Sequence, residues 1–93
     1  MTTLGFIGTG NLAGFLVEGL SRARAPYDIM VSPRNAARAR DLNERFGVRI
    51  AKDNQQVIKA CVLVLVSVLP QDAESVLSGL NYRAGQTILS AMA

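Results

Sequence analysis

The stretch GFIGTGNLAGFLVEGL, residues Gly5 to Leu20, decides the fold expected for this chain of 93 residues. Its first letters complete a short apolar run from Thr3 to Ile7, and such a run predicts a β-strand. Apolar residues then recur at helical spacing from Asn11 to Arg24, which predicts an amphipathic helix. The segment between them, Gly8 to Ala13, has the pattern G-x-G-x-x-A. A strand, this pattern and a helix in succession are typical of a turn that binds a dinucleotide.

The glycine turn contains the residue types that a pyrophosphate needs. Gly8 permits a tight turn from strand to helix, and Gly10 has no Cβ that would keep a phosphate away from the backbone. Ala13 is small enough for the helix to pack closely on the strand. We expect the free N–H groups at the positive end of the helix dipole to face the pyrophosphate. The alternative is a glycine turn with a structural role only.

The rest of the chain alternates short apolar strands with helices. The run CVLVLVSVL, residues 61–69, is continuously apolar, as in a central parallel strand that is buried on both faces. Right-handed crossovers between such strands predict one α/β domain over residues 1–93, a Rossmann-type doubly wound parallel sheet of order 3-2-1-4-5. The later predicted strands are Tyr27–Ser32, Val48–Ala51, Cys61–Leu69 and Thr87–Met92, and the later helices run from Asn35 to Phe46, from Asp53 and from Pro70.

The composition excludes several classes of protein. Hydrophobic residues make up 49% of the chain and the mean hydropathy is +0.24, which excludes a disordered protein. Aromatic residues make up only 5% of the chain, so a surface that stacks nucleic-acid bases is not suggested. The longest apolar stretch is far shorter than a helix that spans a membrane. The single cysteine, Cys61, excludes an internal disulfide, and we expect it to be a buried, unreactive thiol. The first three residues lack the basic leader of a signal peptide, so we expect no signal peptide. We therefore expect a soluble, cytoplasmic domain with no metal, nucleic-acid or membrane partner.

Basic residues are concentrated in the middle of the chain. The net charge is +3, and nine of the ten Lys and Arg residues lie between Arg22 and Lys59. One interpretation is that most of them lie on solvated helix faces. The other is that they create a local positive field for an anion.

The segment after the second predicted strand indicates which nicotinamide cofactor fits. A site that prefers NAD usually has an acidic residue about 20 residues beyond the glycine turn, where it binds the ribose 2′-hydroxyl. This chain has Ser32-Pro33-Arg34-Asn35 there, with no carboxylate to repel a 2′-phosphate. Arg34 can bind that phosphate through its planar guanidinium, Ser32 can add a hydroxyl donor, and Arg38 lies one helical turn further on. We therefore expect NADP(H). The alternative for Arg34 is an exposed arginine at a helix start, where its charge opposes the dipole.

Five segments resemble, in their order and spacing, the N-terminal domain of pyrroline-5-carboxylate reductase, the NADPH-dependent enzyme family of proline synthesis. They cover essentially the whole chain, which makes the resemblance far more specific than the glycine motif alone. The segments are GFIGTGNLA at residues 5–13, VSPRNAARA at 31–39, Asp53-Asn54, Val68-Leu69-Pro70-Gln71, and ILSAMA at 88–93.

The resemblance implies a role for each segment. The pyrophosphate would be held by Gly8, Thr9, Gly10, Asn11 and Leu12, and the 2′-phosphate would be bound by Ser32 and Arg34. Asn54 would contact the adenosine side, and residues 90–92 would border the nicotinamide ring. Four residues at the end of the fourth predicted strand and the start of the next helix would pass beside the nicotinamide ribose: Ser67, Val68, Leu69 and Pro70. Without the resemblance, Asn54 is equally well an exposed polar residue near a helix start. The residues from Ser67 to Pro70 are then equally well the end of a strand followed by a proline that starts a helix.

Two departures from the family affect what the resemblance implies. Leu69 stands where the family commonly has lysine, which removes a cation near the nicotinamide and leaves room for a different imine or carbonyl substrate. Leu12 stands where methionine is frequent, a nearly isosteric change. Family members also carry a second, helical domain that builds the dimer and most of the imine pocket, and we expect these 93 residues not to include it.

The resemblance thus implies the NADPH-binding domain of a homo-oligomeric reductase that reduces the C=N bond of pyrroline-5-carboxylate to give proline. The chain has no histidine and no acid–base pair, so we assign it no catalytic residue and expect it to be inactive alone. The alternatives are another NADP-dependent reductase, of the β-hydroxyacid dehydrogenase or deazaflavin-linked type, and a standalone nucleotide-binding module. A helical domain downstream in the reading frame would favour a reductase.

Overall fold

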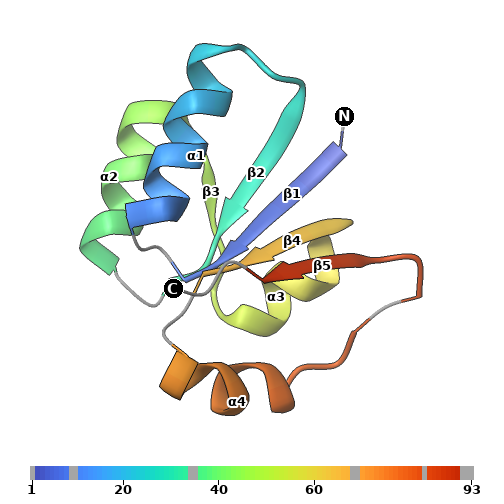
Figure 1. Ribbon diagram of the computed structural model, residues 1–93. Coiled ribbons are helices and arrows are strands. Elements are labelled where there is room, and N and C mark those ends of the chain that lie inside the picture. The colour runs from blue at the N-terminus through green and yellow to red at the C-terminus, as the bar shows by residue number, and fades with distance from the viewer. Residues whose placement is uncertain (1, 9–10, 34–35, 68–69, 83, 91–93) are drawn as a thin grey trace.

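A five-stranded parallel sheet lies at the centre of the molecule, in the order β3-β2-β1-β4-β5 (Figure 1). The computed structural model describes residues 2–8, 11–33, 36–67, 70–82 and 84–90. This strand order is the one predicted from the sequence. The strands are β1 (Thr2–Ile7), β2 (Tyr27–Val31), β3 (Arg49–Ile50), β4 (Leu63–Val66) and β5 (Thr87–Ser90). The helices are α1 (Asn11–Arg22), α2 (Ala36–Phe46), α3 (Asn54–Ala60) and α4 (Pro70–Ser78).

The helices cover both faces of the sheet. Helices α1 and α2 lie on one face, and α3 and α4 lie on the other (Figure 1). Because successive strand residues point to opposite faces, neighbours in β1 enter different cores. Phe6 packs with Ala13 and Val17 of α1, whereas Ile7 packs with Val57 and Ile58 of α3. The doubly wound arrangement therefore rests on two hydrophobic cores that share the sheet.

Helix α1 ends at Arg22, two residues before the predicted end at Arg24. Arg24 adopts a left-handed conformation, with φ of 54°. The N–H of Ala25 donates to the carbonyl of Leu20 at 3.0 Å, and the N–H of Arg24 donates to that of Ser21 at 3.1 Å. These two bonds make up a Schellman motif, which normally uses glycine at the left-handed position. The predicted helix was two residues too long because an arginine at the left-handed position, unlike a glycine, does not indicate a helix end in the sequence.

Two other helix ends agree with the sequence signals. Helix α2 is followed by Gly47, whose φ is 72° and whose N–H donates to the carbonyl of Asn43 at 2.9 Å. Asp53 precedes α3 as its N-cap, because its Oδ1 accepts a hydrogen bond from the N–H of Gln56 at 2.8 Å. Its carboxylate therefore acts by a direct bond as well as through the helix dipole.

The fourth strand is shorter than the predicted Cys61–Leu69, and its burial on both faces was predicted wrongly. The N–H of Cys61 closes α3 by donating to the carbonyl of Val57 at 3.0 Å, so the strand begins only at Leu63. Val64 is fully buried under the α3 side, but Leu63 and Leu65 on the α1 side are only partly buried. Among the described residues, α1 and α2 lie over the β1–β3 half of their face, as their packing with Phe6 and Val31 indicates.

Two expectations drawn from composition can be compared with the structure. Cys61 is fully buried, as predicted. No helix within the described residues has the length and apolar character that spanning a bilayer requires.

Candidate functional site

The carboxyl end of β1 is the point at which the direction of winding reverses. The chain passes from β1 to β2 and β3 on one side, and it then returns to β4 and β5 on the other. In open parallel sheets, ligands bind at such a switch point, beyond the carboxyl ends of the strands. Gly8 directly follows β1, Ser32 follows β2 and Ser67 follows β4. These three residues therefore mark the expected binding edge.

Hydrogen bonds hold the end of β1 between its two neighbouring strands. The N–H of Ser32 donates to the carbonyl of Phe6 at 2.9 Å, and the N–H of Ser67 donates to that of Ile7 at 2.8 Å. The N–H of Gly8 donates to the hydroxyl oxygen of Ser32 at 2.9 Å, in a buried position. Gly8 has φ of 89°, a conformation that side-chain-bearing residues rarely adopt. The turn after β1 is therefore bonded on both sides at a position that requires glycine.

The glycine turn leads directly into α1, as predicted. Helix α1 begins at Asn11, and Ala13 is fully buried in the core beneath it, where a small residue allows close packing. The first N–H groups of a helix have no partner within the helix, so this end of α1 offers donors to an anion. Thr9 and Gly10 lie outside the described residues, and of Asn11 and Leu12 only the helical backbone is described.

The segment after β2 contains the residues predicted to bind the 2′-phosphate. Ser32 is fully buried, and its hydroxyl oxygen accepts the bond from Gly8. Arg34 lies outside the described residues. Arg38 lies beside the start of α1, because a Cβ on Gly14 would come within 3.8 Å of its Nη1. The bond between Ser32 and Gly8 was not predicted from the sequence, in which the two residues lie 24 positions apart.

The remaining predicted site residues follow other strands at the same edge of the sheet. Asn54 is the first residue of α3, which follows β3, and it is partly buried. Ser67 is also partly buried, and Pro70 is the first residue of α4. Val68 and Leu69 lie outside the described residues. Because all five strands are parallel, the topology brings Asn54 and Ser67 to the edge that also carries Gly8.

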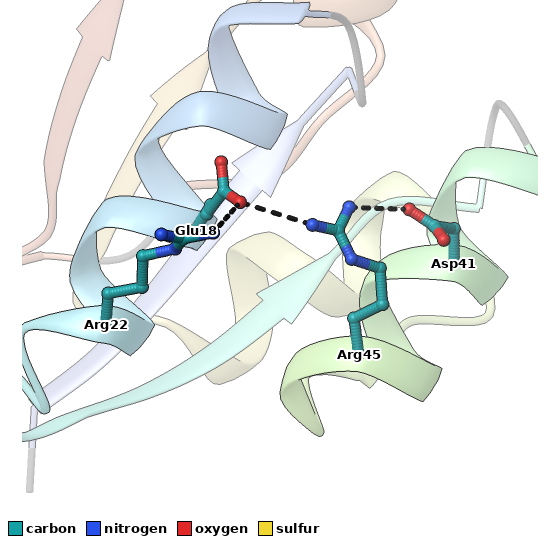
Figure 2. Close-up of polar contacts among 4 residues, drawn as sticks. All are labelled: Glu18, Arg22, Asp41 and Arg45. Carbon is teal, nitrogen blue, oxygen red and sulfur yellow. Dashed lines mark hydrogen bonds and ion pairs between the residues drawn. The ribbon is translucent and has the colours of Figure 1, made fainter.

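Several of the clustered arginines are paired with carboxylates on the surface. Arg45 of α2 contacts Glu18 of α1 and Asp41 of its own helix, each at 3.2 Å, and Arg22 contacts Glu18 at 3.0 Å (Figure 2). In the sheet, Arg49 of β3 forms an ion pair with Asp28 of β2 at 2.8 Å. For these arginines the structure supports the interpretation of solvated faces. A positive field for an anion would come from the basic residues nearer the glycine turn.

A doubly wound sheet with a positive-φ glycine and a helix N-terminus at its switch point defines a dinucleotide-binding domain of the Rossmann type. The chain belongs to the family described as NADP oxidoreductase, coenzyme F420-dependent, whose model matches residues 3–93. Its relatives identify it more closely as an N-terminal NAD(P)-binding domain of the pyrroline-5-carboxylate reductase and imine reductase group.

Individual relatives agree on this placement. Pyrroline-5-carboxylate reductase 1 of Bacillus spizizenii is 36% identical over an alignment 93 positions long, which covers 95% of this chain and 31% of the relative. The structure of a pyrroline-5-carboxylate reductase from Coxiella burnetii matches with a TM-score of 0.85 at 26% identity, over 98% of this chain and 35% of that one. The structure of an imine reductase from Aspergillus terreus, in complex with NADPH4 and dibenz[c,e]azepine, matches with a TM-score of 0.82 at 26% identity. The match covers 99% of this chain and 32% of that one. The chain therefore spans about a third of the length of these relatives.

Proposed function

We propose that this chain is the NADPH-binding domain of an oxidoreductase that reduces the C=N bond of pyrroline-5-carboxylate to give proline. The observation that carries the proposal is the turn at Gly8, which is held at the switch point of the sheet and leads into the N-terminus of α1. The similarity to the Bacillus spizizenii reductase supports the choice of substrate.

In this proposal the pyrophosphate binds at the start of α1. The N–H of Gly8 is already donated to Ser32, so Gly8 contributes the shape of the turn. Thr9, Gly10, Asn11 and Leu12 then supply the N–H groups, with the helix dipole favouring the negative charge. The tight packing of Ala13 keeps this end of the helix close to β1.

The other contacts follow from the carboxyl ends of the remaining strands. Arg34 forms a bidentate, charge-assisted pair with the 2′-phosphate, since the segment after β2 has no carboxylate to repel it. Asn54 contacts the adenosine, and the residues from Ser67 to Pro70 pass beside the nicotinamide ribose. The position of Asn54 and Ser67 at the same edge as Gly8 supports this assignment.

The chemistry is divided between the cofactor and two parts of the protein. Bound NADPH supplies the hydride for the imine carbon, while residues of this chain bind and orient it. The remaining two-thirds of the enzyme, by comparison with the length of the relatives, would supply the imine pocket and the proton for the nitrogen. We therefore assign no catalytic residue to this chain.

A chimera tests the proposal. Residues 1–93 of this chain would replace the matching third of the Bacillus spizizenii reductase, and NADPH oxidation would be followed with pyrroline-5-carboxylate. We expect turnover by the chimera, and NADPH binding without turnover by the 93-residue chain alone. A folded chimera that binds NADPH and does not reduce pyrroline-5-carboxylate would contradict the proposal.

The family description favours a second candidate, in which hydride passes between NADPH and coenzyme F420. Such an enzyme would oxidise NADPH to NADP⁺ and reduce F420, without an imine. Addition of oxidised F420 to the chimera and to the chain tests it. Loss of the absorbance of oxidised F420, matched by loss of NADPH, would favour this candidate over imine reduction.

A further inference from the structure

We infer that Ser32 is a positioning residue, whose hydroxyl holds the turn at Gly8 in the shape that binds the pyrophosphate of the cofactor. This inference rests on the proposed cofactor site and deepens it. It gives Ser32 a role that acts through Gly8, in place of direct contact with the 2′-phosphate.

The burial and bonding of Ser32 carry the inference. Ser32 is the one polar residue that is buried within the described part of the chain, and its relative exposure is 0%. Buried polar side chains are retained where they satisfy a partner that would otherwise be left without one. Here the partner is the N–H of Gly8, 2.9 Å from the hydroxyl oxygen and itself in a buried residue.

Ser32 bonds to the end of β1 twice. Its own N–H donates to the carbonyl of Phe6 at 2.9 Å, at the last pair of the β1–β2 ladder, Phe6 with Val31. Its hydroxyl then accepts from the N–H of Gly8, two residues beyond Phe6 and just past the end of β1. The register of β1 with β2 ends at Phe6 and Val31, and the N–H of Gly8 bonds to a side-chain oxygen and not to the backbone of β2. The hydroxyl therefore fixes the first residue of the turn after regular pairing ends.

This position gives Ser32 a defined effect on binding. The N–H groups at the start of α1 must converge on one phosphate group. If the turn that leads to them is conformationally free, the entropy lost when it becomes ordered on binding lowers the affinity. Removal of the hydroxyl leaves the N–H of Gly8 buried without its acceptor, which loosens the turn. The loss therefore applies to every ligand that carries the pyrophosphate, with or without a 2′-phosphate.

Titrations of the chain with NADPH and NADH separate this role from direct phosphate contact. We expect Ser32→Ala to raise the Kd for NADPH and the Kd for NADH by the same factor, roughly 5- to 20-fold. The ratio of the two Kd values should stay unchanged. Ser78→Ala, which removes an exposed serine of α4, is the matched control and should change neither Kd. A loss confined to NADPH would overturn the inference, because it would show direct contact with the 2′-phosphate. Unchanged binding of both cofactors would also overturn it.

Amide hydrogen exchange gives a second readout. In Ser32→Ala the N–H of Gly8 should exchange faster, while the N–H groups of Ser67 and Ala51, bonded to Ile7 and Val31, keep their protection. If Ser32→Ala does not fold, Ser32→Cys, whose thiol is a weaker acceptor of similar size, takes its place with the same expected pattern. A chain that binds neither cofactor before substitution would instead contradict the proposed function. Binding of both, with Gly8 exchange unchanged in the variant, contradicts the inference about Ser32 alone.

Discussion

Gly5 of β1 lies directly against Cys61, so that a Cβ atom on Gly5 would come within 2.8 Å of the Cys61 Sγ. The same atom would lie 2.5 Å from Cγ1 of Val57 in α3. Real Cβ atoms do not approach other side chains so closely, and α3 therefore packs on β1 more tightly than any other residue at this position would allow. Cys61 is fully buried at this contact, where it acts as a small apolar side chain.

Gly5→Ala should destabilise the fold. The added methyl group would force apart β1 and the residues of α3 that it meets, and overpacking of this kind costs about 1–3 kcal/mol. Urea denaturation followed by circular dichroism measures the change in the free energy of unfolding. Gly19→Ala is the matched control, because a Cβ at Gly19 meets nothing within 4 Å. The control lies inside α1 and should stabilise the chain by about 0.5–1 kcal/mol. Equal effects of the two substitutions would contradict the close contact.

Arg45→Gln should change the stability only slightly. Its guanidinium bridges Glu18 and Asp41 at the surface (Figure 2), where water and salt screen the attraction. The side chain of Arg45 is 51% exposed, so we expect a loss below about 1 kcal/mol. Thermal unfolding in low and high salt measures it, and the difference between variant and parent should shrink in high salt. A loss of several kcal/mol that salt does not reduce would show that the network contributes more than an exposed pair.

Asp53→Ala should destabilise α3 by removing its N-cap. The carboxylate accepts the N–H of Gln56 at 2.8 Å, and N-caps of this type contribute about 1 kcal/mol. Asp53→Asn is the control, since its amide oxygen can accept the same bond, and it should retain most of the stability. If chemical denaturation gives the same loss for both variants, the stabilisation comes from the charge of Asp53 and not from the cap.

The strand order could be predicted from the sequence because strands alternate with helices, right-handed crossovers favour a parallel sheet, and the glycine motif after the first strand is typical of the doubly wound fold. The turn at Gly8 and the close packing of Ala13 were predictable for the same reason, since one short motif contains them. The partial exposure of Leu63 and Leu65 was not, because it depends on how much of a sheet face the helices cover.

Two contacts at β1 also required the structure. Gly5 appeared in the sequence as part of an ordinary strand, and only the position of α3 reveals why no side chain fits there. Ser32 was assigned to a phosphate on the strength of its place after β2. Its bond to Gly8 depends on which way one hydroxyl points between two parallel strands, and no spacing in the sequence encodes that direction.

The proposal that this chain is an NADPH-binding domain is tested most directly by calorimetric titration of the 93-residue chain with NADPH and with NADH. We expect NADPH to bind at least about tenfold more tightly, because a charge-assisted contact to the 2′-phosphate contributes on the order of 1.5–3 kcal/mol. Arg34→Ala should remove that advantage, whereas Arg40→Ala, which removes an exposed arginine of α2, should preserve it. Equal affinity for the two cofactors in the unmodified chain, or binding of neither, would contradict the account.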